Sequence, residues 1–304
     1  MTTDQSVATT DRATAENPYG AGRPRPAAGA EEPPTATPRR TGPLGRIASL
    51  AVAELKVLRR NSVAAFYAIA MAPAMLLLMT TLPVWEDIAS VAGPSMSVRA
   101  LGMLAIFGIV MAIYFNLTTA AVARRESLAL KRQVSGTARP WEVLTALAIP
   151  NTAVFLAQVV IAFAVVATRM EMPALTNPLV AVVGVLLGAI VFALLAYVTT
   201  IVTRTAESAQ LTTMPMMLVG LVISGALVPM SVLPDTAATV LELLPVMPIT
   251  ELVTIGLGGT SLAGQELSLM ETFTHAARPA AVLAIWIAVL AVVVSKKMPF
   301  EPRR

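Results

Sequence analysis

The sequence predicts an all-α integral membrane protein with six transmembrane helices and both termini in the cytoplasm. Composition is the first observation behind this fold class: 56% of the 304 residues are hydrophobic and 13% are charged, whereas a soluble domain has about 25% charged residues. The second observation is a series of apolar runs near the ~20 residues that a helix needs to cross ~30 Å of hydrocarbon. The third is an asymmetric distribution of lysine and arginine.

The N-terminal residues fall into two segments. Residues 1–43 are rich in Thr, Ala, Pro, Arg and Glu without an apolar run, so a disordered cytoplasmic tail is predicted. Residues 44–61 are predicted to form an amphipathic helix in the membrane interface, with Ile47 on its apolar face and Arg46 on the opposite face. Its other charged residues are Glu54, Lys56, Arg59 and Arg60. Alternatively, these residues are the wetted first turns of a longer helix.

Six spans are predicted within residues 62–297, before a cytoplasmic tail at 298–304. They are Val63–Leu82, Ala100–Ala123, Val143–Thr168, Leu179–Val202, Leu211–Val228 and Ala280–Ser295. None of the six interiors contains Asp, Glu, Lys, Arg or His, as expected when one central charge costs about 2.5–3.5 kcal/mol. The last span is short and would require tilt or local thinning of the bilayer. His275 is placed in the external loop before it.

The distribution of basic residues predicts the orientation. Nineteen of the 22 Lys and Arg residues lie on one side of the spans, and the opposite loops hold Arg99, Arg169 and Arg278. By the positive-inside rule the basic side, which includes both termini, is cytoplasmic. A multi-pass protein of the plasma (inner) membrane is therefore expected. Because the charges are sorted by membrane side and not gathered on one face, a nucleic-acid partner is not expected.

A proline-containing segment follows the fifth span, at residues 223–259. Pro229, Pro234, Pro245 and Pro248 interrupt a largely apolar stretch. One or two short external half-helices are predicted, which dip into or lie on the outer leaflet. Because non-helical backbone at membrane depth needs protein or water beside it, the segment is expected to pack on the bundle.

Several kinds of chemistry are excluded by residue content. The chain has no cysteine and one histidine, so thiol catalysis and a multi-histidine metal site are not available. It has no G-x-x-x-x-G-K-[ST] motif, and therefore no P-loop of its own. The spans also lack the intramembrane carboxylate or histidine that ion-coupled carriers usually need. Active transport would therefore draw its energy from elsewhere.

Polar and methionine side chains inside the spans have two interpretations. They form hydrogen bonds or packing contacts between helices, or they line a translocation pathway. The residues considered for the pathway are Asn116, Asn151, Gln158, Met214 and Met217. Threonines near the inner ends of the second and fourth spans, among them Thr118, Thr199, Thr200 and Thr203, allow the same two interpretations.

The loop after the second span, ARRESLALKRQVSGTARPWEVLTA at Ala123–Ala146, is densely charged. A short helix is predicted there. Gly136 would end it, Thr137 would cap the next helix, and Pro140 would lie in that helix's first turn.

Three motifs, in order, resemble the export permeases of the ATP-binding-cassette (ABC) type-2 family. Arg125-Glu126 and Trp141-Glu142 resemble the family's first cytoplasmic loop, where an arginine-glutamate pair opens a coupling helix. Ala53–Leu76 resembles its interfacial elbow helix and first span, and Ser224–Pro245 resembles its external half-helices. The resemblance covers Leu44 to Lys297. Glu126 is followed by Ser127-Leu128, where many members have Gly-Thr.

The resemblance implies a permease subunit of an ABC exporter that is not itself an enzyme. Two such chains would form the pathway, and separate cytoplasmic ATPase subunits would bind ATP and Mg. The expected ATPase-docking residues are Arg124, Arg125, Glu126, Lys131, Arg132, Trp141 and Glu142, and the expected external gate contains Ser224, Gly225, Pro229 and Pro234. Apolar spans and methionines favour a hydrophobic, drug- or antibiotic-like small molecule, moved outward. The alternative is a non-transporting membrane scaffold or assembly factor without an ATPase partner.

Overall fold

The computed structural model describes residues 42–60, 69–70, 73–78, 81, 94–135, 138–222 and 235–301. Within these ranges the chain is helical, apart from connecting segments and one isolated bridge between Thr260 and Glu266. The helices are α1 (Pro43–Arg60), α4 (Met96–Gly108), η1 (Ile109–Phe115), α5 (Asn116–Glu126), α6 (Ala129–Val134), α7 (Pro140–Arg169), α8 (Pro178–Val202), α9 (Ala206–Val222), α10 (Asp235–Glu242), α11 (Val246–Gly258) and α12 (Leu269–Lys297). The all-α prediction is confirmed for these residues.

Four of the described helices are long and apolar enough to cross a membrane. The first is Met96–Glu126, in which α4, the π-helical η1 and α5 form one continuous rod. The others are α7, α8 and α12. They correspond to the predicted second, third, fourth and sixth spans. Most of the predicted first span lies outside the described residues, and for the fifth span only α9, of 17 residues, is described.

The predicted sixth span is shorter than the helix that the structure describes there. The apolar run begins at Ala280, but α12 begins at Leu269 and has 29 residues, about 44 Å at 1.5 Å per residue. Ser268 caps it: its hydroxyl accepts from the Glu271 N–H, and the Glu271 carboxylate accepts from the Ser268 N–H. This capping box starts the helix at Leu269, so its first turns contain the charged residues Glu271 and Arg278 that precede the apolar run. His275 therefore lies on a helix and not in a loop, and the span needs no thinning of the bilayer.

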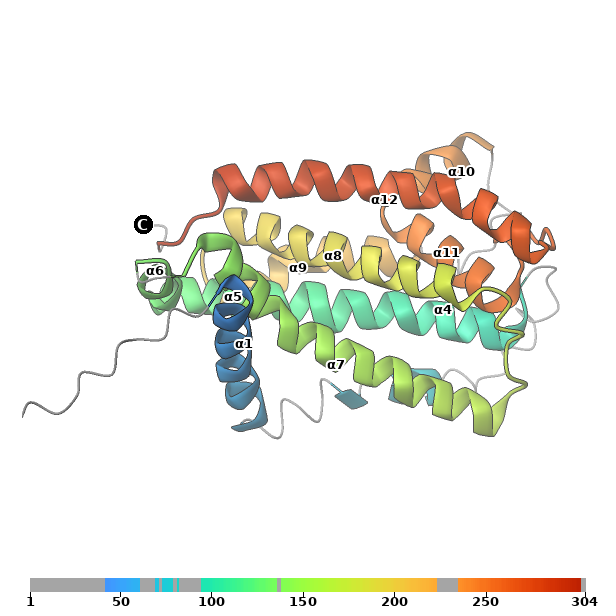
Figure 1. Cartoon of the computed structure of the whole chain (residues 1–304), viewed down its shortest axis with the longest axis horizontal. Coiled ribbons are helices and arrows are strands. Elements are labelled where there is room, and N and C mark those ends of the chain that lie inside the picture. The colour runs from blue at the N-terminus through green and yellow to red at the C-terminus, as the bar shows by residue number, and fades with distance from the viewer. Residues whose placement is uncertain are drawn as a thin grey trace, which may run out of the picture. The chain divides into compact units, whose positions relative to one another are not determined.

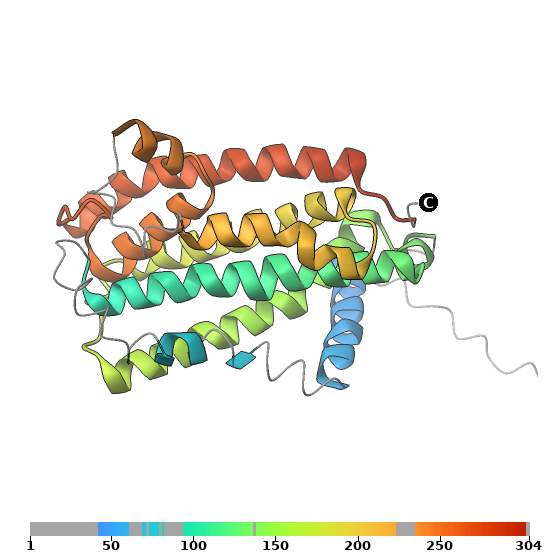
Figure 2. The ribbon, with the colours of Figure 1, turned by 180° about the vertical axis from the view of Figure 1, so that it is seen from behind.

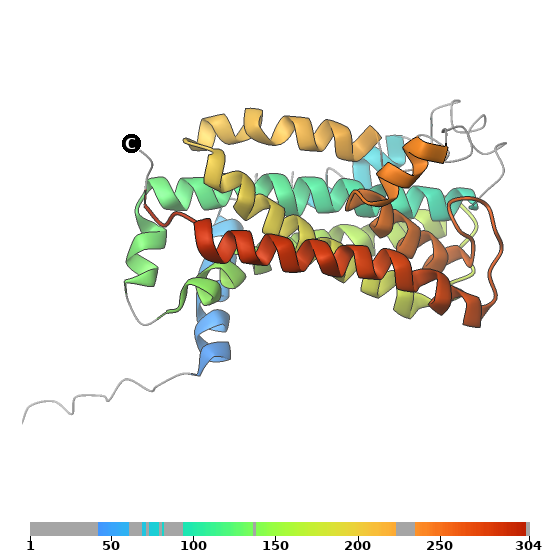
Figure 3. The same cartoon turned by 90° about the horizontal axis from the view of Figure 1, so that it is seen from above.

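The long helices run side by side, and the short elements lie at their ends (Figure 1). The α5–α6 turn and α1 lie near one end, which we call the α6 end. Helices α10 and α11 lie near the other, which we call the α11 end. Helix α1 crosses the direction of the long helices and packs against α7 (Figure 1). From behind and from above, α9 follows the α4–α5 rod (Figures 2 and 3).

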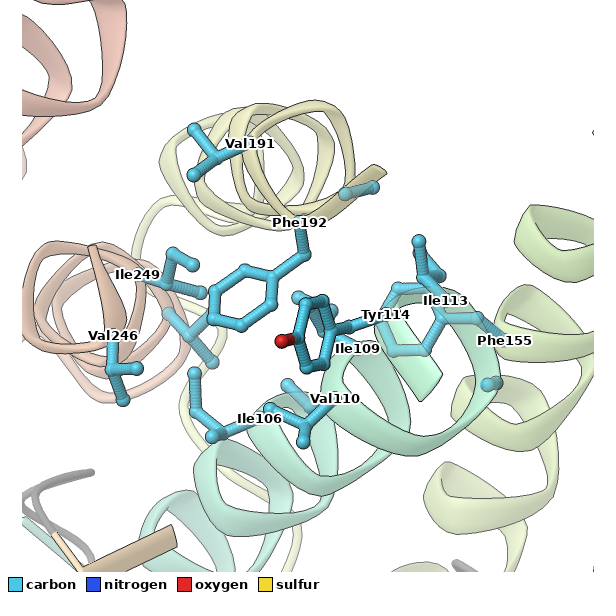
Figure 4. Packing of buried hydrophobic residues seen from close by; sticks show 14 of the residues in the cluster. Ile106, Ile109, Val110, Ile113, Tyr114, Phe155, Val191, Phe192, Val246 and Ile249 are labelled. Carbon is cyan, nitrogen blue, oxygen red and sulfur yellow. The ribbon is translucent and has the colours of Figure 1, made fainter. Parts of the chain in front are cut away.

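The core lies where η1, α7, α8 and α11 meet (Figure 4). The Tyr114 and Phe192 rings meet edge to face, with centroids 6.0 Å apart. Phe155 of α7 and Ile249 of α11 are fully buried beside them. Because these rings come from distant parts of the chain, the core joins α7, α8 and α11 to the central rod.

Helix α11, in the described part of the proline-containing segment, packs on the bundle as predicted. Its 13 residues span about 20 Å, too short to cross ~30 Å of hydrocarbon, yet most of them are buried against α8, α12 and α4. Small residues permit this approach. A Cβ added at Gly256 would lie 2.3 Å from the backbone nitrogen of Ala181, and one at Gly184 would lie 2.6 Å from Leu252 Cβ. Glycine at these positions lets the two helices approach closely.

We expect Gly256→Ala to lower the unfolding temperature in detergent, because the methyl group meets Ala181 backbone that no side-chain rotation can move. Overpacking of this kind costs about 1–3 kcal/mol. Gly220→Ala is the matched control, since its Cβ would lie 3.6 Å from Val246 Cγ2, an ordinary contact. Equal unfolding temperatures for the two variants would contradict the close packing of α11 on α8.

Candidate functional site

The charged loop forms the α6 end of the bundle. The predicted docking residues lie on α5, α6 and the start of α7, and they divide by exposure. Arg124 is partly exposed, and Glu126, Lys131, Arg132 and Trp141 are exposed. The side chains of Arg125 and Glu142 are fully enclosed. In this structure these two residues hold parts of the same chain together, so their side chains do not form part of an outer docking surface.

Arg125 binds the C-terminal end of α8. Its Nη1 donates to the carbonyl of Thr200 at 2.7 Å, and its Nη2 donates to those of Thr203 at 2.6 Å and Arg204 at 3.1 Å. The last carbonyls of a helix have no partner within it and carry partial negative charge. A buried guanidinium supplies both donors and opposite charge there. Arg125 therefore ties the end of α5 to the end of α8.

Glu126 binds the next element. Its Oε2 accepts from the backbone N–H of Ala206, the first residue of α9, at 3.1 Å. Helix N-termini carry free N–H groups and partial positive charge, which suit a carboxylate. The two neighbouring residues thus contact both sides of the α8–α9 connection, the cation at a helix C-terminus and the anion at a helix N-terminus.

The threonines predicted at the inner ends of two spans lie in this α5–α8 interface. Tyr114 Oη is 3.0 Å from Thr199 Oγ1, and Thr118 Oγ1 is 3.4 Å from the Ala196 carbonyl. Thr200 and Thr203 supply carbonyls to Arg125. The hydroxyl contacts support the interhelical hydrogen-bonding interpretation for Thr118 and Thr199. The hydroxyls of Thr200 and Thr203 donate to carbonyls of their own helix. The sequence does not predict the contact of Tyr114 with Thr199, because one aromatic residue in an apolar run does not indicate a hydrogen bond.

Glu142 joins α7 to α1. Both of its oxygens accept from Arg46, from Nη2 at 2.6 Å and from Nε at 2.9 Å, and Oε2 also accepts from the Arg139 N–H. This ion pair raises the pKa of Arg46 above its ordinary value. The bidentate geometry is the strong form of an arginine–carboxylate contact. Arg139 is the N-cap residue of α7, and its N–H donates to the Glu142 carboxylate, so Thr137 is not the cap. Gly136 and Thr137 lie outside the described residues.

Helix α1 is held at two further points. Ile47 and Ala51 are buried with Ala146 of α7, and Arg124 of α5 forms an ion pair with Glu54. Ile47 and Arg46 are predicted on opposite faces of α1, yet both contact α7, Ile47 beside Ala146 and Arg46 through Glu142. Lys56 is exposed. The side chains of Arg59 and Arg60 lie outside the described part of the structure.

The α5–α6 turn has an unusual backbone. Leu128 has φ 59°, a left-handed conformation that costs a residue with a side chain roughly 1–2 kcal/mol. Leu130 behind it is fully buried, and Lys131 forms an exposed ion pair with Glu301 at 2.9 Å, which contributes little stability. A sharp turn anchored by one leucine thus presents Glu126, Lys131 and Arg132 to the surroundings.

The residues considered for a pathway do not share one surface. Gln158 is 1% exposed, and it lies against Gly108, where an added Cβ would be 2.8 Å from Gln158 Oε1. Asn151 donates to the Leu147 carbonyl of its own helix. Met214 is 53% exposed, and Met217 is partly buried against the core. Asn116 is partly buried. The expected gate residues Ser224, Gly225, Pro229 and Pro234 lie outside the described residues.

We expect Arg46→Met to loosen α1. The helix would lose its bidentate contact with α7, while the Glu142 carboxylate would still accept from the Arg139 N–H. Hydrogen exchange measured by mass spectrometry should be faster in α1, and in α7 it should be faster only in the first turn around Glu142, which loses its counter-charge. Lys56→Met removes an exposed cation from the same helix and serves as the control. Unchanged protection of α1 in Arg46→Met would show that the ion pair does not hold it.

The similarity of this chain to known proteins extends over most of the helical bundle. No curated protein matches the sequence. The family model described as ABC-2 family transporter protein matches residues 58–296, from the end of α1 to the last turn of α12. This range is more than half of the chain and includes the α5–α6 turn, the four candidate spans and α11. The chain therefore belongs to the ABC-2 family of transporter proteins.

Proposed function

We propose that this permease subunit exports a hydrophobic small molecule, using ATP hydrolysed by a separate ABC ATPase subunit that docks on its α6 end. Two permease chains form the pathway, and ATP and Mg bind on the ATPase. The family implies an ABC ATPase partner and a membrane location. The observation that carries the proposal is the pair of contacts from Arg125 and Glu126 to the ends of α8 and α9.

These contacts make the α5–α6 turn suitable for receiving force. Arg125 donates to three carbonyls at the end of α8, and charge-assisted bonds of this kind are stronger than neutral ones. A partner that displaces the turn therefore pulls on α8 and, through Glu126, on α9. The exposed Lys131 and Arg132, with partly exposed Arg124, form the surface that such a partner contacts. The two enclosed residues, Arg125 and Glu142, transmit force and hold helices together, and they do not contact the partner.

Helix α1 supports a membrane interface at the same end. It crosses the direction of the long helices (Figures 1 and 3), and Leu44, Val52 and Leu55 are exposed along it. Exposed apolar residues on a crosswise helix suit the boundary between acyl chains and headgroups. The Arg46–Glu142 and Arg124–Glu54 pairs would keep α1 beside the docking surface.

The scaffold alternative is not favoured. An assembly factor would need no internal connection between an exposed charged turn and the ends of two long helices, whereas a transporter needs one. The apolar surface of the helices, including Met214 and Leu218 of α9, supports a hydrophobic cargo.

The orientation can be tested with single cysteines, because the native chain has none. We expect Glu266→Cys, in the exposed loop at the α11 end, to react with a membrane-impermeant maleimide in intact cells. Ser127→Cys, exposed at the α6 end, should react only after the membrane is opened. Labelling of Ser127→Cys in intact cells would place the α6 end outside and refute ATPase docking there.

The docking role can be tested at Glu126. We expect Glu126→Arg, reconstituted with its ATPase partner, to abolish substrate-stimulated ATP turnover, because the substitution reverses a charge on the docking surface and removes the acceptor at Ala206. Glu171→Arg alters an exposed carboxylate that follows α7 toward the α11 end and should leave turnover unchanged. Undiminished stimulation in correctly inserted Glu126→Arg would count against the proposal.

A further inference from the structure

A cavity of about 260 Å³ lies at the α11 end, between α10, α11, the loop before α12, and α12 itself. It is separate from the contacts at the α6 end, which lie at the opposite end of the bundle (Figure 1). Its apolar wall includes Met247, Pro248 and Val282, and its polar residues are Glu242, Glu251, Gln265, His275 and Arg278. Ligand pockets typically combine an apolar wall with a few convergent polar groups.

The charges around this cavity do not balance. Arg278 is paired with Glu242 at 2.8 Å, so its charge is already compensated. Glu251 accepts from the Leu262 N–H at 2.9 Å through Oε2. Among the ion pairs of the described residues, none involves Glu251. With His275 counted as neutral, two carboxylates and one guanidinium leave the lining with one negative charge.

The position of Glu251 makes that charge costly. Burial raises the pKa of its carboxyl group, and the nearby Glu242 raises it further, although the Leu262 hydrogen bond acts in the opposite direction. A charged group that is taken out of water without an opposite charge is destabilised. A cation entering the cavity would supply the missing counter-charge and meet an apolar wall.

We infer that this cavity binds a small organic ammonium ion, whose charged nitrogen contacts Glu251 and whose apolar body packs against Met247, Pro248 and Val282. A metal ion fits less well, because the described residues contain no group of three or more His, Asp or Glu arranged to hold one. An anion would meet Glu251 and find Arg278 already paired. The cavity volume is below the about 300–1,000 Å³ typical of sites for drug-sized ligands. It therefore suits a smaller ligand. A cargo role for the ion would rest on the proposed export function; the binding does not.

The test is calorimetric titration of the full chain, without nucleotide, in nanodiscs of phosphatidylglycerol. The probe is phenethylamine, and its neutral isostere 2-phenylethanol is the ligand control. We expect one phenethylamine per chain and at least about tenfold weaker binding of the alcohol. Glu251→Gln should weaken phenethylamine binding by at least about tenfold, while it keeps an acceptor for Leu262. Glu266→Gln, an exposed carboxylate in the same loop that does not line the cavity, should bind normally.

Equal affinity for amine and alcohol, or an unchanged affinity in Glu251→Gln, would overturn the inference. If Glu251→Gln does not fold, Val282→Phe provides a second test, because it fills the cavity and leaves the carboxylate in place. It should weaken phenethylamine binding, and normal binding by this variant would overturn the inference. Since ATP is absent, failure here is distinct from failure of the export proposal.

An ammonium group can also come from a lipid headgroup. Nanodiscs that contain phosphatidylethanolamine distinguish the two sources. Weaker phenethylamine binding in these discs, with no such difference for Glu251→Gln, would assign the site to the headgroup ammonium. Unchanged binding would assign it to a water-soluble amine. Either result supports recognition of ammonium by Glu251.

Discussion

The end of helix α8 sets the central constraint on this structure. The last carbonyls of a helix have no partner within it, and near hydrocarbon each unsatisfied carbonyl is costly. Arg125 satisfies this requirement with a buried guanidinium that donates to Thr200, Thr203 and Arg204. Since Arg125 belongs to the central α4–α5 rod, the solution also couples two spans. The same residue therefore completes α8 and connects it to the exposed turn at Glu126.

This arrangement separates charged residues into two roles. Enclosed ones, Arg125 and Glu142, join helices that are distant in sequence, whereas exposed ones on α5 and α6 remain available to a partner. The division follows from desolvation: a charge taken out of water needs hydrogen bonds and opposite charge around it, and an exposed charge does not. A permease driven by another subunit needs both kinds, one to receive force and one to carry it into the bundle.

The two ends of the bundle are built differently. At the α6 end, the enclosed Arg125 and Glu142 are matched by a helix terminus and by Arg46, and α1 is held across the long helices. At the α11 end, α11 enters the bundle through close contacts at Gly184 and Gly256, and Glu251 is held beside a cavity without a matching cation in the described ion pairs. The first end is the one proposed to contact an ATPase subunit, and the second is the one proposed to bind a small ligand.

The sequence by itself determined the membrane class, four candidate spans that the structure describes, the charged loop and the packing of a short helix after the predicted fifth span. Hydropathy and proline spacing are local, so they are readable along the chain. Only tertiary structure decided that Arg46 meets Glu142, 96 residues away, and that Arg125 is enclosed. The reason is physical: whether a charge faces solvent or a helix end depends on which helices pack together, and residue type does not encode that choice.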